Sequence, residues 1–145
     1  MQELVKNFGV SFQDDDYRIF SVAIDGDLVG RKIEKLIISN KLDELIEYSH
    51  VINKSVDSIR LVANSVGGKT YLQGGQSLLV EVKSYQSFIK KLIEIHLGLV
   101  ATFSVGIGKN IVEAHLVLKF AKSAGRGLII LVEVVNGEFK FRHIT

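Results

Sequence analysis

The sequence predicts an α+β fold with a ferredoxin-like core, in which helices pack on a central antiparallel sheet. The expected order of elements is β-α-α-β-β-α-β-α-β-β, and this order contains the β-α-β-β-α-β unit of that core. No proline interrupts the elements, and hydrophobic residues make up 47% of the 145 residues, which is enough to bury a substantial core. We therefore expect a single domain over residues 1–145, with residues 1–16 as a peripheral N-terminal segment.

The first strand is predicted over Tyr17–Ile24 by a run of apolar and β-branched residues, and the turn Asp25-Gly26-Asp27 is expected to end it. Apolar residues at helical spacing then predict one helix that begins near Leu28. A second helix is expected to be capped by Asn40 and to end near Gly67-Gly68. Its apolar residues should form one stripe, made of Leu42, Leu45, Ile46, Ile52, Val56 and Ile59.

A β-hairpin is predicted from Lys69–Leu72 and Ser77–Glu81, joined across Gly74-Gly75, because glycine adopts positive φ without steric strain. In a ferredoxin-like sheet this hairpin lies beside the first strand, so its turn should lie near Asp25 and Asp27. The remaining predicted elements are a helix over Tyr85–Leu97 capped by Ser84, a strand over Ala101–Ile107, a helix over Ile111–Ser123 that ends at Gly125, a strand over Leu128–Val135, a type I′ turn at Asn136-Gly137 and a strand over Phe139–Ile144.

Composition excludes several classes of protein. The formal net charge is +2 without a long basic run, which disfavours general nucleic-acid binding, and the absence of cysteine excludes disulfides and thiolate zinc sites. The start Met1-Gln2-Glu3-Leu4 does not resemble a signal peptide, and the longest apolar stretch near the C-terminus, Leu128–Val135, is far shorter than the roughly 20 residues that span a bilayer. We expect a cytoplasmic protein that binds neither nucleic acid nor membrane directly.

Two groups of charged residues are candidates for chemistry. Asp25 and Asp27 are close enough to bind a divalent metal, but Asp and Gly also dominate ordinary polar turns. Lys119, Lys122 and Arg126 are expected on one face of a helix, where they could bind phosphate or simply favour the dipole of the last turn. From the residues alone, both alternatives stay open for each group.

Four segments carry a resemblance to a known family: Ile24–Asp27, Leu72–Ser77, Phe103–Ile107 and Leu118–Gly127. Over roughly Arg18–Val135, the chain resembles the palm domain shared by GGDEF diguanylate cyclases and the CRISPR polymerase-type palm of the Cas ten family. Since the sequence shows no attached zinc finger, regulatory domain or nuclease, it is most similar to the minimal CRISPR polymerase family (mCpol). These are stand-alone palms of antiviral signalling systems that make cyclic nucleotides.

The resemblance implies that Asp25 and Asp27 are catalytic and that, together with Gly26, they hold Mg²⁺ or Mn²⁺. Backbone amides from Gly26 to Val29, at the start of the first helix, are expected to cradle phosphate. The nucleotide-binding residues implied in full are Gly26, Leu28, Val29, Gly74, Gly75, Gln76, Ser77, Lys119, Lys122 and Arg126.

The sequence departs from the family pattern at two places. Relatives usually carry acidic residues where this chain has Gln76 and Ser77, so either Asp25 and Asp27 suffice together with substrate phosphates or catalysis has been lost. Guanine-specific cyclases carry an asparagine near the position of Ile33. Its absence favours ATP as the substrate.

The implied function is a metal-dependent nucleotidyltransferase that makes a cyclic di- or oligonucleotide from ATP, with a downstream effector that senses the product. Because one palm holds one activated nucleotide, a homodimer would supply the second. The first alternative is a catalytically degenerate palm that binds nucleotide as a sensor or scaffold. A second alternative is a ferredoxin-like interaction module.

Overall fold

The structure, a computed structural model, describes residues 19–96 and 102–144, and over these ranges the elements follow the predicted order. They are β1 (Phe20–Gly26), α2 (Val29–Ile38), α3 (Leu42–Ser65), β2 (Lys69–Gly74), β3 (Ser77–Val82), α4 (Tyr85–His96), β4 (Phe103–Gly108), α5 (Ile111–Ser123), β5 (Ile129–Val135) and β6 (Glu138–His143). The predictions for residues 1–18, Leu97 and Ala101 lie outside the described residues.

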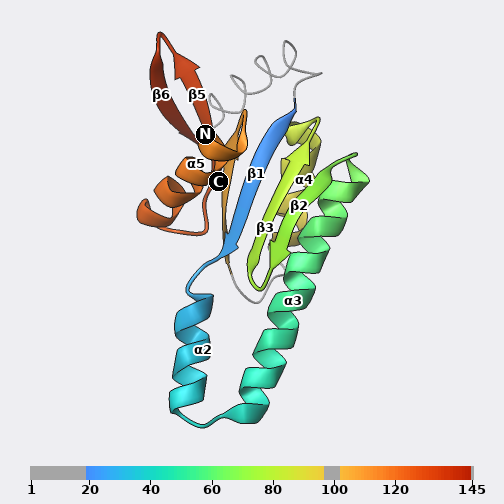
Figure 1. Cartoon of the computed structure of the whole chain (residues 1–145), viewed down its shortest axis with the longest axis vertical. Coiled ribbons are helices and arrows are strands. Elements are labelled where there is room, and N and C mark those ends of the chain that lie inside the picture. The colour runs from blue at the N-terminus through green and yellow to red at the C-terminus, as the bar shows by residue number, and fades with distance from the viewer. Residues whose placement is uncertain (1–18, 97–101, 145) are drawn as a thin grey trace.

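The strands form a sheet in the order β2-β3-β1-β4-β5-β6 (Figure 1). Neighbouring strands are antiparallel except for the parallel pair β4 and β5. The central strand β1 pairs with β3 of the hairpin on one side and with β4 on the other, so the predicted α+β palm with the hairpin beside the first strand is confirmed. The final hairpin turns at Asn136 and Gly137 with φ of 52° and 79°, as a type I′ turn requires.

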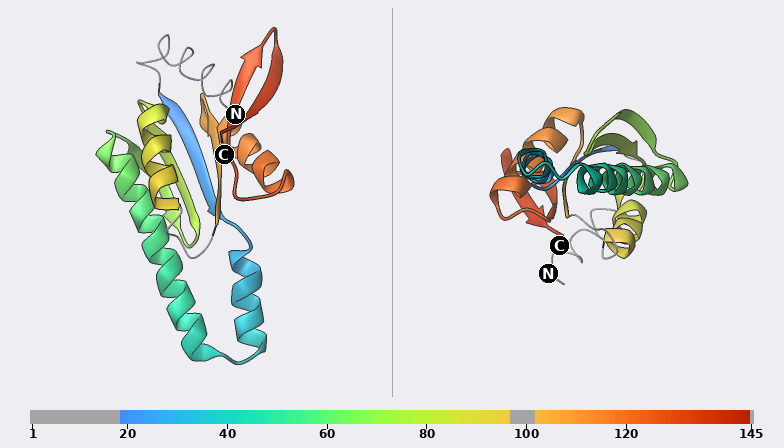
Figure 2. Two further views of the ribbon diagram at one scale, coloured as in Figure 1. Left: turned by 180° about the vertical axis from the view of Figure 1, so that it is seen from behind. Right: turned by 90° about the horizontal axis from the view of Figure 1, so that it is seen from below.

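The two faces of the sheet are covered differently (Figure 2). Helices α3 and α4 pack on one face and bury the larger hydrophobic cluster, while α5 packs on the other face against β5 and β4. Side chains of a strand alternate between faces, which is why consecutive residues such as Ile129 and Ile130 belong to different clusters. The larger cluster includes Val22, Ile24, Val56, Ile59, Leu78, Val80, Phe88 and Leu92.

Helix α5 lies directly on β4 because β4 carries glycine where the two backbones meet. A Cβ atom at Gly106 would be 2.4 Å from the Leu118 nitrogen and 2.5 Å from the Ala114 oxygen. The helix is thereby held over β4, and an open apolar groove of about 570 Å³ remains on the same face, over β1 and β3. The groove is lined by Ala23, Ile24, Asp25, Leu72, Ser77, Leu78, Leu79, Ile111, Val112, His115 and Leu118.

Two local predictions were wrong. Strand β1 does not stop before the acidic turn but continues through Asp25 to Gly26. Asn40 does not cap α3, because Asn40 adopts a left-handed φ of 55° and the helix begins at Leu42 after Lys41. The predicted apolar stripe of α3 is buried only in the C-terminal part of the helix. Ile46, near the N-terminal end, is 69% exposed because that end projects beyond the sheet, beside α2 (Figure 1).

Within the described ranges, no helix combines the length and the hydrophobicity needed to cross a membrane.

Candidate functional site

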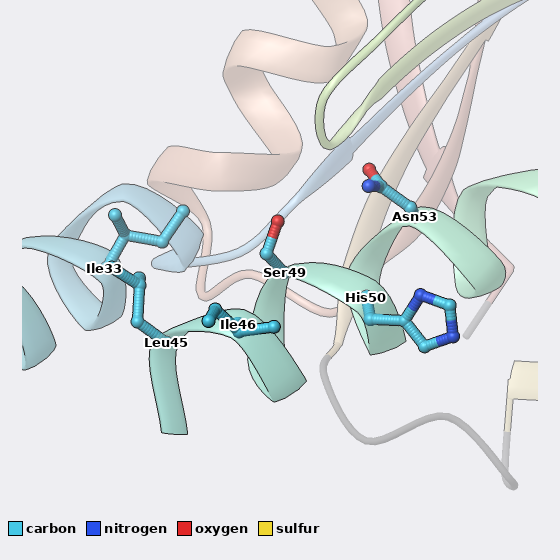
Figure 3. A pocket seen from close by; sticks show the side chains of 6 residues that line it. All are labelled: Ile33, Leu45, Ile46, Ser49, His50 and Asn53. Carbon is cyan, nitrogen blue, oxygen red and sulfur yellow. The ribbon is translucent and has the colours of Figure 1, made fainter. Parts of the chain in front are cut away.

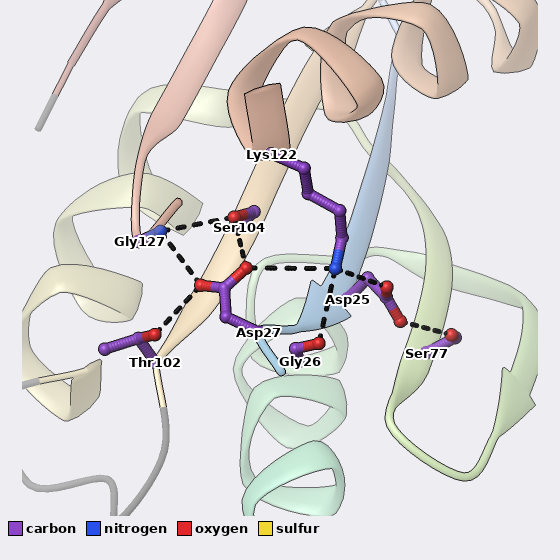
Figure 4. A network of polar contacts seen from close by, with 8 residues as sticks. All are labelled: Asp25, Gly26, Asp27, Ser77, Thr102, Ser104, Lys122 and Gly127. Atoms are coloured by element: carbon purple, nitrogen blue, oxygen red, sulfur yellow. Dashed lines mark hydrogen bonds and ion pairs between the residues drawn. The ribbon is translucent and has the colours of Figure 1, made fainter. Parts of the chain in front are cut away.

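The candidate site lies where β1 ends. Asp25 is the penultimate residue of β1 and Asp27 follows its last residue, Gly26. Strand alternation directs Asp25 to the face covered by α5, opposite to the core residue Ile24. Both carboxylates therefore lie below the C-terminal end of α5, together with polar groups from β3 and β4 (Figure 4).

Asp27 is the hub of the polar network, and its side chain is 2% exposed. Its Oδ1 accepts a hydrogen bond of 2.6 Å from the Ser104 hydroxyl. Its Oδ2 accepts bonds of 2.9 Å from the Thr102 hydroxyl and 2.8 Å from the Gly127 backbone N–H. Because hydrogen bonds to an ionised acceptor are strong, Asp27 ties the end of β1 to β4 and to the loop after α5.

Asp25 is more accessible, and its two oxygens have different partners. Oδ1 accepts a hydrogen bond of 2.6 Å from the hydroxyl of Ser77, the residue opposite it on β3. Oδ2 forms an ion pair of 2.6 Å with the Lys122 ammonium. Ser77 thus orients Asp25 instead of adding a third carboxylate.

Lys122 reaches the carboxylates from the last turn of α5, so its predicted place in the site is supported by direct contacts. Besides the bond to Asp25, its Nζ donates to the Gly26 carbonyl oxygen at 3.3 Å and lies 3.8 Å from Asp27 Oδ1. Three oxygen atoms from consecutive residues therefore surround one cationic group.

This arrangement of oxygens also fits a divalent ion. Mg²⁺ prefers oxygen ligands and is commonly held by one or two carboxylates, with substrate phosphates and water completing its shell. Here the ammonium of Lys122 stands among two carboxylates and a carbonyl, the donor types that such an ion takes. Among the described residues no cluster of three or more His, Cys, Asp or Glu side chains could hold a metal, so Asp25 and Asp27 are the carboxylates that the site offers.

The other two basic residues form no contact with the carboxylates. Lys119 lies on α5 three residues before Lys122, as predicted, but Arg126 does not share this helix, contrary to the prediction. Helix α5 ends at Ser123, and the chain leaves it through Gly125, Arg126 and Gly127 with φ of 138°, 62° and 63°. Arg126 is therefore a loop residue in a left-handed conformation. Its side chain and that of Lys119 are exposed, and neither forms a hydrogen bond or ion pair with another described residue.

Of the four backbone amides from Gly26 to Val29 that were predicted to cradle phosphate, two already donate to acceptors within the protein. The Gly26 N–H donates to the Gln76 carbonyl at 3.0 Å, and the Asp27 N–H donates to the Thr102 carbonyl at 2.9 Å. The amides of Leu28 and Val29 have no acceptor within the described residues. Leu28 has a left-handed φ of 57° and provides no side-chain cap, which leaves this end of α2 open.

The hairpin turn lies against the end of β1. Its turn residues are Gly75, with a left-handed φ of 54°, and Gln76. A Cβ atom at Gly26 would be 2.7 Å from Val29 Cγ2 and 3.1 Å from Gln76 Cβ, so glycine at position 26 permits the close approach of β1, α2 and the hairpin.

An open cavity of about 490 Å³ lies between α2 and α3 (Figure 3). Helix α2, which carries Ile33, begins two residues after Asp27, so this helix connects the carboxylate site to the cavity along the chain. Its lining residues are Ile33, Leu45, Ile46, Ser49, His50 and Asn53.

The sequence did not identify Thr102, Ser104 and Gly127 as partners of Asp27. Ser104 and Gly127 lie in segments that the resemblance quotes, but nothing local to them indicates a role in the site. The sequence feature that could have indicated Ser104 is its position as a serine within an otherwise apolar strand. Ser104 is fully buried in the structure, and a buried hydroxyl needs a hydrogen-bond partner.

A family model described as the minimal CRISPR polymerase domain matches residues 21–132. The chain belongs to this family. No curated protein matches the sequence. Thus the family assignment rests on the model match, which includes Asp25, Asp27, Ser104, Lys122 and Gly127 within its range.

Solved structures show the same palm fold as this minimal CRISPR polymerase. The X-ray structure of a diguanylate cyclase/phosphodiesterase from Caldicellulosiruptor saccharolyticus is 19% identical and aligns over 94% of this chain and 88% of its own, with a TM-score of 0.57. The adenylyl cyclase CyaB from P. aeruginosa is 12% identical over 79% of this chain and 76% of its own, with a TM-score of 0.55. Family and fold together support a nucleotide cyclase- or polymerase-like function.

Proposed function

We propose that this minimal CRISPR polymerase is a metal-dependent nucleotidyltransferase that joins ATP molecules into a cyclic di- or oligonucleotide. The observation that carries the proposal is the convergence of Asp25, Gly26 and Asp27 oxygens on one cation position, where the Lys122 ammonium lies. A triphosphate substrate needs a cationic site of this kind because its negative charge increases as pyrophosphate leaves.

Each group at the site has a role in this proposal. Asp25, Asp27 and the Gly26 carbonyl would hold Mg²⁺ or Mn²⁺, which would neutralise phosphate charge and favour ionisation of the attacking hydroxyl. Lys122 and the exposed Arg126 would bind the terminal phosphates. The open amides of Leu28 and Val29, at the N-terminus of α2, would bind a further phosphate oxygen.

The cavity between α2 and α3 is the proposed base site. Its volume of about 490 Å³ is within the usual range for small-ligand pockets. Ile33 of α2 lies against Leu45 of α3, while the Ser49 hydroxyl and the Asn53 amide point to the same side (Figure 3). An asparagine amide presents both donors and an acceptor, so it could pair with an edge of either purine. The preference for ATP over GTP in this proposal rests on the apolar Ile33, near the position where guanine-specific cyclases carry an asparagine.

The proposed reaction is a phosphodiester-forming substitution. A 3′- or 2′-hydroxyl oxygen of one nucleotide attacks the α-phosphorus of a second, a phosphodiester bond forms, and the bond to the leaving pyrophosphate breaks. The hydroxyl proton passes to solvent. Repetition of the step between the two ends closes the ring, so a cyclic dinucleotide forms with release of two pyrophosphates.

The reaction joins nucleotides that a single site would not hold together, so we propose that the chain acts as a homodimer. The apolar groove beside the site supports this, because Asp25 and Ser77 line both the site and the groove. Three of its apolar lining residues, Leu72, Ile111 and Val112, are exposed. A second copy seated there would bring its own nucleotide close to Asp25.

The biological setting that we propose follows from the family resemblance: a cytoplasmic enzyme of antiviral signalling whose product is sensed by a downstream effector. A product identified chemically would allow that effector to be sought by its affinity for the cyclic nucleotide.

The test is incubation of the purified protein with each nucleoside triphosphate and Mg²⁺ or Mn²⁺, followed by mass spectrometry and a pyrophosphate assay. We expect a cyclic adenylate from the wild-type chain and none from Asp25→Asn. Asp43→Asn, which removes a carboxylate from the exposed start of α3, is the matched control and should keep activity. Pyrophosphate release that is the same in the wild type and Asp25→Asn would contradict the proposal.

One observation favours a second candidate function, a palm that binds nucleotide without turnover. The hairpin supplies Gln76 and Ser77 instead of carboxylates, and the Ser77 hydroxyl is already bound to Asp25. This candidate predicts saturable ATP binding with no pyrophosphate release, even with Mn²⁺.

A further inference from the structure

The Lys122 ammonium occupies the position that a divalent ion would take. It lies 2.6 Å from Asp25 Oδ2, and the Gly26 carbonyl oxygen and Asp27 Oδ1 complete the group around it at 3.3 Å and 3.8 Å. The Lys122 and Asp25 side chains are only 28% and 22% exposed, so this is not a freely solvated surface ion pair. Lys122 is thus an internal cation at the centre of the site.

We infer that Lys122 is a displaceable counter-ion that holds the metal position until nucleotide arrives, an inference that rests on the proposed function. A divalent ion bound by the same oxygens would lie about 2 to 2.5 Å from each of them. Two cations that close together repel strongly in a partly desolvated site. Lys122 must therefore leave before metal can bind with full affinity.

The structure also shows where Lys122 can go. Its side chain is a flexible four-carbon stem at the last turn of α5, directly before the loop that carries the exposed Arg126. A triphosphate beside this loop would offer Lys122 new anionic partners. Nucleotide binding then draws Lys122 away from Asp25 and opens the metal position.

The consequence is positive coupling between metal and nucleotide. Bound nucleotide must raise metal affinity by the same factor as bound metal raises nucleotide affinity, because coupling free energy is reciprocal. Without nucleotide, the chain should bind metal weakly, because Lys122 already neutralises part of the negative charge. A lysine with a purely structural role would leave metal affinity unchanged when it is replaced.

The test is a titration with Mn²⁺ alone, followed by electron paramagnetic resonance of the free ion, on the wild type, Lys122→Met and Lys122→Gln. Methionine keeps the length and packing of the stem without the charge, and glutamine also keeps a polar group near Asp25. We expect both variants to bind Mn²⁺ about tenfold more tightly than the wild type. Lys90→Met, which removes an exposed charge from α4 on the other face of the sheet, should leave the affinity unchanged.

A second titration tests the coupling in the wild type and remains informative if the Lys122 variants do not fold. Addition of a non-hydrolysable ATP analogue should raise the affinity of the wild type for Mn²⁺ about tenfold, after correction for Mn²⁺ bound by the free analogue. Lys122 variants that bind Mn²⁺ no more tightly than the wild type, or wild-type affinity that the analogue does not change, would overturn the inference.

These measurements separate the inference from the proposed function. Tighter Mn²⁺ binding by Lys122→Met supports the counter-ion role even if no nucleotide product is ever found. Conversely, cyclic product from the wild type together with unchanged Mn²⁺ affinity in the variants would support the enzyme and reject the counter-ion role.

Discussion

Asp25 and Asp27 differ in role although they are separated by a single glycine. Asp27 accepts hydrogen bonds from Thr102, Ser104 and Gly127 and is buried, whereas Asp25 is bound by a serine and a lysine at the open side of the site. The structure therefore predicts that loss of Asp27 weakens the fold, whereas loss of Asp25 weakens cation binding.

Asp27→Asn should lower the free energy of unfolding by about 2 kcal/mol. The asparagine amide nitrogen is a hydrogen-bond donor, and it would face groups that now donate to the Asp27 carboxylate. The measurement is urea denaturation followed by circular dichroism. Asp25→Asn is the comparison, and it should lower stability less while abolishing Mn²⁺-dependent activity. Equal stability of Asp27→Asn and the wild type would show that Asp27 is not the anchor of the site.

Ser77→Glu should bind Mn²⁺ about tenfold more tightly than the wild type, since a third carboxylate would stand opposite Asp25. The same change should lower stability in the absence of metal, because the introduced carboxylate would repel Asp25. Isothermal titration with Mn²⁺ measures the first effect and thermal unfolding with and without Mn²⁺ measures the second. Gln76→Glu adds the same charge to the neighbouring turn residue. An equal gain in Mn²⁺ affinity in this variant would show that the effect comes from net charge alone.

At the scale of elements, the contact between α5 and β4 places Lys122 above the carboxylates. Gly106→Ala should force the helix to move, because the new methyl group would meet α5 backbone atoms and not a flexible side chain. We expect a loss of about 2 kcal/mol in stability and weaker binding of an ATP analogue. Thermal unfolding and analogue titration check the two effects.

Gly30→Ala on α2 is the control for Gly106→Ala. Nothing lies within 4 Å of the Cβ position at Gly30, so this substitution should raise stability by roughly 0.5 to 1 kcal/mol through helix propensity. A destabilisation of similar size in both variants would contradict the packing argument.

The order of the elements was predictable from apolar periodicity, but their ends were less so. Asn40 has the side chain of a helix cap, yet tertiary packing uses its tolerance of left-handed φ in the connection between α2 and α3. The spacing of Lys122 and Arg126 suggested one helical face, but the sequence Gly125-Arg126-Gly127 permits three consecutive positive φ values that end any helical periodicity. Local residue preferences did not determine either outcome.

At the scale of the whole molecule, the apolar groove next to the site predicts self-association. Val112→Glu introduces a charge into a groove residue that is 64% exposed, so the folded monomer should tolerate it while the dimer should not. We expect sedimentation analysis to show a dimer for the wild type and a monomer for Val112→Glu. The amount of cyclic product should fall in proportion to the loss of dimer. Ile38→Glu, at an exposed apolar position at the end of α2, is the control. A wild type that is monomeric at concentrations where it is active would contradict the proposed dimer.

The assembled site was only partly predictable. Asp25, Gly26, Ser77 and Lys122 were predicted and are in contact, because each lies in a segment whose resemblance to the family is local. The partners of Asp27 were missed because they depend on the order of strands in the sheet, which places β4 beside β1. Hydrogen-bond partners that are distant in sequence leave no local pattern.

The separation in sequence of the groups around Asp27 bears on how the protein is made. The bond from Gly127 to Asp27 joins residues 100 positions apart, and that from Lys122 to Gly26 spans 96. During synthesis the end of β1 leaves the ribosome long before α5, and contacts that close such long loops form late in folding. A nascent chain therefore has both carboxylates without their lysine, and the site is complete only after α5 and the loop that follows it have been translated.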